Sequence, residues 1–162
     1  MIRSVLYATD LGLYAPYVLQ HALNLSHALK AELYVVHAVE PMGLFAESVL
    51  QTYLDEKTLQ ELRSKGLDNV MACIEKRVLE AFRDELGDVP HDTQLIRNVR
   101  VAQGDAAQVI LDEARKLAVD LLVVGSHSHG ATQETPLGRT AARVLQLSEI
   151  PVYLVPMLQH RA

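Results

Sequence analysis

Residues 121–140 read LLVVGSHSHGATQETPLGRT, and this stretch decides the fold. Four apolar residues run directly into Gly125, and a polar loop then leads to Pro136 and Gly138. The apolar run predicts a buried strand, and the spacing of apolar residues from Leu137 to Leu147 predicts a helix. A buried strand that leads through a glycine-bearing loop into a helix is how α/β proteins build anion sites, because backbone N–H groups and the helix dipole face the loop.

The same two patterns alternate along the rest of the chain. Apolar runs predict four further strands, at residues 4–8, 33–39, 95–101 and 152–155. Apolar residues at helical spacing predict three further helices, at residues 14–30, 55–86 and about 104–117. This alternation predicts a single α/β domain over residues 1–162, a doubly wound, five-stranded parallel sheet with helices on both faces.

Residues 41–54 are the least regular part of the chain and include Pro41 and Gly43. We expect a loop packed on the sheet there, and a lid or a partner-binding surface is the alternative. Residues 55–86 have one long helical stripe, and their many charges are expected to form a solvated face. Residues 95–101 alternate apolar and polar side chains, which is typical of an edge strand with one wet face.

The predicted helices have recognisable ends and faces. Pro16 suits the first turn of a helix. Asp105 and Gln108 have the spacing of a capping box at the start of another. The expected buried positions are Val18, Ala22, Leu25 and Leu29 in the first helix and Ala141, Val144 and Leu145 in the last.

The composition limits the classes of function. Hydrophobic residues make up 49% and charged residues 22%, which indicates a folded core. The net charge of −5 and the lack of a basic stripe argue against nucleic acid or an anionic membrane as partner. The single cysteine, Cys73, fits a small core residue, and with no secretory signal we expect a cytoplasmic protein. No apolar run approaches the roughly 18 residues of a membrane span.

In a doubly wound sheet, ligands bind at the carboxyl ends of the strands near the switch in strand order. Three segments are expected to meet there: residues 8–10, residues 37–39 and the loop that begins at Gly125. Each has a simpler interpretation on its own, since Asp10 can cap a turn and Gly138 can allow a tight helix entry. Their convergence at one edge of the sheet favours a binding site.

Four segments occur in an order and spacing far more specific than any single glycine. They are VLYATD (5–10), ELYVVHAVE (32–40), VAQGDAAQVILDEARKLAVDLLVVGSHSHG (101–130) and PLGRTAARVLQLSEIPVYLVP (136–156). In these segments, and over nearly its whole length, the chain resembles the universal stress protein (UspA-like) family. The resemblance implies the strand order 3-2-1-4-5, a homodimer paired through the last strand, residues 152–155, and a role in stress adaptation.

This family contains ATP binders, which share Gly-x2-Gly-x9-Gly-(Ser/Thr), and members that bind no nucleotide. Gly125 and Gly138 match the first and third glycines, but Ser128 stands at the second and Arg139 at the hydroxyl position. A glycine allows close approach and positive φ, whereas Ser128 adds a side chain with a phosphate-bonding hydroxyl. Arg139 cannot cap the helix, but its guanidinium is a good phosphate partner, and Thr140 adds a hydroxyl.

The resemblance also implies a place for each part of ATP or another adenine nucleotide, with or without Mg²⁺. Asp10 would lie near the ribose or a phosphate-bound cation, the backbone of Ala38 would read the adenine edge, and Val124 would lie beside the adenosine. The loop and the helix start would surround the phosphates. The implied nucleotide-binding residues are Ala8, Thr9, Asp10, Ala38, Val124, Gly125, Ser126, His127, Ser128, Gly138, Arg139 and Thr140.

Other functions remain open. His37, His127 and His129 could form a zinc-type site with Asp10, but we expect loop histidines that face solvent or a phosphate, and a structural His37. There is no Walker lysine and no nucleophile–base–acid set, so any ATPase activity would be weak, with Asp10 and Mg²⁺ as its only candidates. The loop lacks the hydroxyl-rich phosphate cradle of a flavodoxin-like redox protein. The alternative function is a regulatory or interaction protein of the same family that binds no nucleotide.

Overall fold

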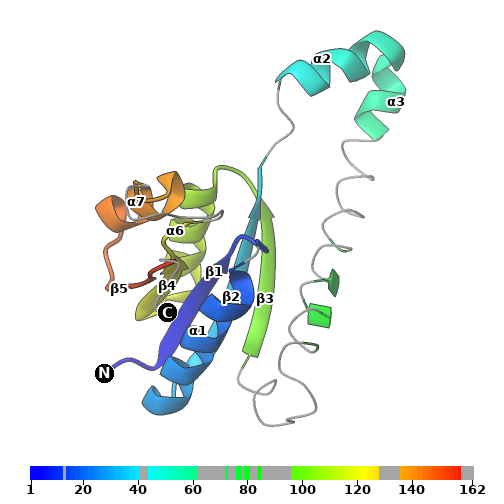
Figure 1. The fold of residues 1–162 in the computed structure, drawn as a ribbon. Helices are drawn as coiled ribbons and strands as arrows, with labels where there is room; N and C mark the ends of the chain where they lie inside the picture. The colour runs from blue at the N-terminus through cyan, green and yellow to red at the C-terminus, as the bar shows by residue number, and fades with distance from the viewer. Residues whose placement is uncertain are drawn as a thin grey trace.

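The computed structural model describes residues 1–12, 14–40, 44–61, 72, 76–77, 79–80, 84, 96–127 and 136–157. Its elements are β1 (Ser4–Thr9), α1 (Ala15–Leu29), β2 (Glu32–Val39), α2 (Leu44–Tyr53), α3 (Glu56–Glu61), β3 (Ile96–Gln103), α6 (Ala106–Leu117), β4 (Leu121–Gly125), α7 (Arg139–Leu147) and β5 (Val152–Val155). The strands form one parallel sheet in the order β3-β2-β1-β4-β5, as predicted (Figure 1).

Two apolar clusters form the core, one on each face of the sheet, because successive side chains of a strand point to opposite faces. Val5 and Tyr7 of β1 pack with α1 on one face. Leu6 of β1 packs with α6 and with Val144 of α7 on the other. β1 and β4 therefore lie at the centre of the molecule, with their carboxyl ends between the two helical layers (Figure 1).

β3 is an edge strand with one wet side, as its alternating sequence predicts. Val99 is buried, whereas Arg97, Asn98 and Arg100 are exposed. Arg100 reaches across to α6, where its Nε lies 3.3 Å from Oε2 of Glu113. The Glu113 side chain is only 4% exposed, so this ion pair joins the edge strand to the helix that covers it.

The expectation of a loop over residues 41–54 is wrong, because residues 44–53 form helix α2. Pro41 and Gly43 precede this helix, and its own sequence, LFAESVLQTY, contains no helix breaker. α2 and α3 lie away from the sheet (Figure 1). The chain leaves the helical state at Leu54, and Asp55 then accepts the Thr58 N–H at 2.7 Å to begin α3.

The single helix predicted over residues 55–86 can be followed only in part. Within that range α3 is helical, as are residues 72, 76–77, 79–80 and 84. Asp55 precedes α3 as its first-turn acceptor, and the remaining residues of the range, Cys73 among them, lie outside the described part of the chain. None of the described helices is long and apolar enough to cross a membrane.

Several predicted helix details need correction. The Asp105 carboxylate accepts the Gln108 N–H at 3.2 Å, but the Gln108 side chain donates to Asp112 at 2.9 Å instead of completing a capping box. Leu29 is 39% exposed because it lies in the last turn of α1, and Leu145 is 40% exposed because it lies one residue beyond the buried Val144. Pro16 lies in the first turn of α1, as predicted, and Val18, Ala22 and Ala141 are buried.

Candidate functional site

A cavity of about 420 Å³ opens where β1, β2 and β4 end. Its walls come from these strand ends and from the first turns of α1, α6 and α7. Every residue predicted for the nucleotide site lines this cavity, from Ala8 to Thr140, except Ser128, which lies outside the described residues. The structure thus brings the predicted set together, and the role of each residue in binding stays a prediction.

The cavity also has lining residues that sequence reasoning missed. Glu40 directly follows β2, so its place at a strand end was a usable signal. Tyr14, Ala106 and Met157 also line it. Tyr14 and Ala106 come from helix starts and Met157 from the segment after β5, and only the packing of these elements brings them here.

Gly138 is required by close packing. A Cβ at this position would lie 2.8 Å from the backbone oxygen of Ser126, a distance that real Cβ atoms essentially never show. Its φ of −55° is open to any residue, so the glycine is there for space. The Gly138 N–H donates to the same Ser126 oxygen at 2.9 Å and is therefore already used within the protein. The simpler interpretation of Gly138, a tight helix entry, is confirmed.

The start of α7 is left open by this glycine. The first intrahelical bond runs from the Ala142 N–H to the Gly138 oxygen, so the N–H groups of Arg139, Thr140 and Ala141 have no acceptor inside the helix. Gly138 has no side chain with which to cap them. Arg139 and Thr140 are exposed, and all three residues line the cavity. Free N–H donors and the positive end of a helix dipole are features that favour an anion at a helix start.

Ser126 and His127 tie the loop together. The Ser126 Oγ accepts the Met157 N–H at 2.9 Å and lies 2.8 Å from the His127 Nδ1. The His127 Nε2 lies 2.7 Å from the Pro136 oxygen. Because a carbonyl only accepts, Nε2 carries the proton, and in the neutral ring Nδ1 accepts the Ser126 hydroxyl.

The two histidines at the cavity thus hold the backbone in place. The His127 ring joins β4 to the residues that lead into α7 and also lines the cavity, so its predicted contact with a phosphate stays a prediction. His37 is structural, as predicted, because its Nδ1 donates to the Thr9 oxygen at 2.8 Å. Within the described parts of the chain no group of three or more potential metal ligands is found.

The turn after β1 is fixed by its own side chains. The Asp10 Oδ1 accepts the Gly12 N–H at 2.7 Å, and the Thr9 Oγ1 accepts the Leu11 N–H at 3.1 Å. The simple role of Asp10 as a turn cap is therefore confirmed. Beneath this turn, burial raises the pKa of Tyr7 far above its usual range, so its hydroxyl stays protonated and donates to the Ala15 oxygen at 3.0 Å.

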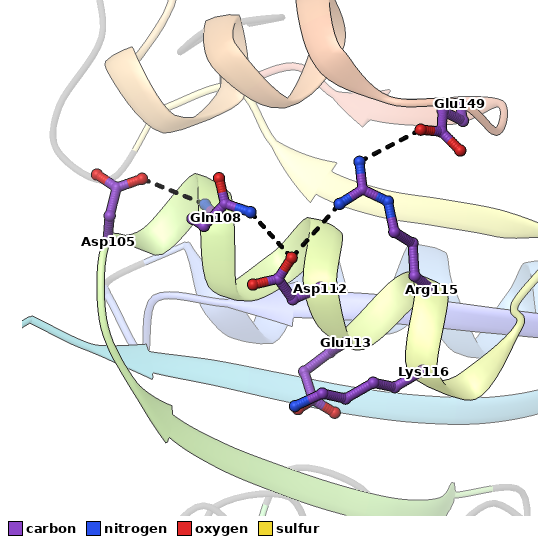
Figure 2. A network of polar contacts seen from close by, with 7 residues as sticks. All are labelled: Asp105, Gln108, Asp112, Glu113, Arg115, Lys116 and Glu149. Carbon is purple, nitrogen blue, oxygen red and sulfur yellow. Dashed lines mark hydrogen bonds and ion pairs between the residues drawn. The ribbon is translucent and has the colours of Figure 1, made fainter.

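A surface network joins the helices behind the cavity. Arg115 of α6 contacts Asp112 at 3.4 Å and reaches Glu149, beyond the end of α7, at 3.3 Å (Figure 2). At the other end of α6, Asp105 lies 3.6 Å from Arg143 of α7. These groups are half exposed or more, so each pair contributes little to stability, and the buried apolar cluster that α6 shares with Val144 of α7 holds the two helices together.

Comparison with known proteins gives one consistent family. The family model described as "Universal stress protein family" matches residues 1–156. The chain is 26% identical over 156 residues to universal stress protein YxiE of Bacillus subtilis, with 96% of this chain and 99% of that protein covered. It is 30% identical over 155 residues to the "Universal stress protein in QAH/OAS sulfhydrylase 3'region" of Thermus aquaticus, with 96% and 99% covered.

Solved structures share the fold. MJ0577, which is named a universal stress protein of Methanocaldococcus jannaschii, superposes with a TM-score of 0.67 at 23% identity, covering 100% of this chain and 99% of that one. A universal stress protein described as in complex with cAMP gives a TM-score of 0.58 at 16% identity, covering 96% and 98%. At these identities the likeness establishes the fold alone.

Proposed function

The chain belongs to the universal stress protein family, and we propose that it is a homodimeric stress-response regulator that binds an adenine nucleotide. The site is the cavity at the carboxyl edge of the sheet. The observation that carries this proposal is the start of α7, where no side chain of the described residues caps the helix and the N–H donors border a cavity large enough for a small ligand. One structural relative is described as a complex with cAMP, which supports an adenine nucleotide as the ligand class.

The cavity offers each part of a nucleotide a suitable surface. Ala8, Ala38 and Val124 pack on the apolar cluster beneath the sheet edge and give the base a small-residue floor. Arg139 and Thr140 add a guanidinium and a hydroxyl to the backbone donors of α7, a combination that suits phosphate.

Asp10, at the end of β1, supplies a carboxylate that can accept hydrogen bonds from ribose hydroxyls. The same carboxylate would coordinate a Mg²⁺ ion that is bound to the phosphates. The residues of the loop and of the start of α7 have two different roles. The polar groups of Ser126, His127 and Gly138 make hydrogen bonds that hold the loop in place. We therefore assign the phosphate contacts to Arg139, Thr140 and the N–H of Ala141.

Titration calorimetry with AMP, ADP and ATP tests the proposal. We expect binding in the millimolar range or tighter, and Arg139→Gln should weaken it roughly tenfold through loss of a charge-assisted contact. Arg115→Gln is the matched control, since Arg115 is an exposed arginine of the α6 surface network that does not line the cavity. The absence of heat with any adenine nucleotide at millimolar concentration, in a folded protein, would contradict the proposal.

The homodimer is proposed through β5. β5 is an edge strand with Tyr153 36% exposed, and an unpaired edge invites pairing with a second copy. The oxygens of Pro151 and Val155 accept bonds from the β4 side, so Val152 and Leu154 direct their backbone groups outward. Val152→Pro should therefore dissociate the dimer, as measured by light scattering, and a monomeric wild type would contradict the assignment.

A second function is suggested by the hydrogen bonds that the loop makes within the protein. The Gly138 N–H and the His127 Nε2 are already bonded to backbone oxygens of the protein. In addition, Ser128 and Arg139 depart from the family's ATP-binding pattern. The alternative is a regulatory protein of the cytoplasm that binds partners and no nucleotide. Acid extraction of the purified protein separates the two, because co-purified nucleotide is expected only for the first.

A further inference from the structure

We infer that the ligand of this cavity carries a single phosphate, so that the site takes an adenosine phosphate of the AMP or cyclic AMP type in preference to ADP or ATP. The inference rests on the proposed nucleotide site and deepens it. It comes from the charged side chains among the described residues that line the cavity, which are one arginine, Arg139, and two carboxylates, Asp10 and Glu40.

The positive end is the start of α7. Among the described residues that line the cavity, Arg139 is the only lysine or arginine. The open helix terminus adds about half a positive charge. Together they supply about 1.5 positive charges, which lies between the charge of about −1 on a cyclic phosphodiester and the charge of about −1.5 to −2 on a phosphate monoester near neutral pH.

The loop before α7 brings no further cation. Residues 126–138 read SHSHGATQETPLG, with no lysine or arginine and with one acidic residue, Glu134. His127, the histidine of this loop that the structure describes, has its ring nitrogens bonded to Ser126 and Pro136. A second or third phosphate would therefore meet no additional positive side chain from this segment.

The strand ends at the cavity carry two carboxylates. Asp10 follows β1 and Glu40 follows β2, and both line the cavity. Asp10 follows the strand that pairs with β4, whereas β1 separates the β2 strand of Glu40 from β4. Carboxylates accept hydrogen bonds from ribose hydroxyls or an amino group but repel phosphate. These two acids therefore favour a nucleoside with one phosphate over a longer phosphate chain.

Titration calorimetry with AMP, cyclic AMP, ADP and ATP, each in EDTA and again in excess Mg²⁺, tests this. We expect AMP or cyclic AMP to bind at least roughly tenfold more tightly than ATP in EDTA, with ADP between them. The AMP and cyclic AMP arms distinguish a monoester from a diester ligand. ATP that binds as tightly as the best single-phosphate ligand, with or without Mg²⁺, would overturn the inference while leaving the nucleotide site intact. Failure of every nucleotide to bind would overturn the proposed function as well.

A charge variant tests the cause. Glu40→Gln removes one carboxylate from the cavity without touching α7, and it should narrow the ratio of AMP to ATP affinity roughly threefold. Glu149→Gln is the matched control, because Glu149 is an exposed acid of the α6 network away from the cavity. An unchanged ratio in Glu40→Gln, or an equal change in both variants, would contradict the electrostatic explanation.

Discussion

Helices α6 and α7 begin at the same edge of the sheet and line the same cavity, but their N-terminal ends are capped differently. α6 is capped by its own chain, since the Asp105 carboxylate accepts the Gln108 N–H. α7 begins with Gly138, which has no side chain to offer. Both helices have the same dipole, so the difference in their capping residues decides which one can bind an anion. The start of α7, whose N-cap Gly138 supplies no side-chain bond, is therefore the one that we propose as the anion site.

The largest effect should come from forcing a cap onto α7. Gly138→Ser supplies a capping hydroxyl, but its Cβ would meet the Ser126 backbone oxygen at 2.8 Å. We expect a loss of about 2–3 kcal/mol in the free energy of unfolding, as for other overpacked sites, and loss of nucleotide binding. Urea denaturation and calorimetry measure the two effects.

The matched change on α6 is Asp105→Ser, which exchanges one good cap for another and should be nearly neutral. A Gly138→Ser protein of wild-type stability would show that the glycine is not needed for space.

The second largest effect should come from removing the Ser126 hydroxyl, which holds the loop between β4 and α7. Ser126→Ala removes the acceptor of the buried Met157 N–H and the donor to His127. Because a buried N–H is left unsatisfied, we expect a loss of about 2 kcal/mol. Thermal unfolding measures it, and Ser148→Ala, which removes the short-range bond to Ile150, is a milder control. Equal losses in the two variants would argue against a special role for the Ser126 link.

Removal of the cap on α6 should have a smaller effect. Asp105→Ala takes away the bond to Gln108 and the ion pair with Arg143, and we expect a loss of about 1 kcal/mol. The variant should also bind nucleotide slightly more tightly, because a carboxylate near the start of α7 is gone. Denaturation and calorimetry on the same sample test both parts, and weaker binding would contradict the second.

The smallest effect is expected at Asp120, whose carboxylate accepts backbone N–H groups near the amino end of β1. Asp120 accepts the Arg3 N–H at 2.8 Å and the Ser4 N–H at 3.2 Å. These bonds, the Arg3 bond first, lower the pKa of Asp120 below its usual value. A lowered pKa stabilises the fold above the unfolded-state pKa, and this stabilisation is lost as the pH falls through the folded-state pKa.

Asp120→Asn should therefore flatten a small part of the acid limb of a stability–pH curve, below about pH 4. Its effect at neutral pH should be slight because the group is exposed. Denaturation midpoints between pH 2 and pH 7 in about 1-unit steps measure this. An acid limb identical to that of the wild type would contradict the role of Asp120.

The sequence was informative where structure depends on local pattern. Continuous apolar runs located the strands, because both faces of a parallel sheet are buried. The cap at Asp105 was predicted from residue type and spacing. The same reasoning fails at residues 44–53, because Pro41 and Gly43 just before this segment indicate a loop although the segment itself contains no helix breaker.

The alternation of strands and helices and the strand ends that meet at the cavity follow from the amino-acid pattern, and the sheet order follows from that pattern with the family resemblance. The polar groups of the loop that are left for a ligand follow only from the three-dimensional packing. Ser126 and Met157 are 31 residues apart, and Gly138 is a glycine because the Ser126 backbone passes beside it. Such contacts depend on three-dimensional distances that a local pattern does not encode. For that reason the sequence located the predicted site, whereas the fold showed that Gly138 gives the start of α7 no side-chain cap.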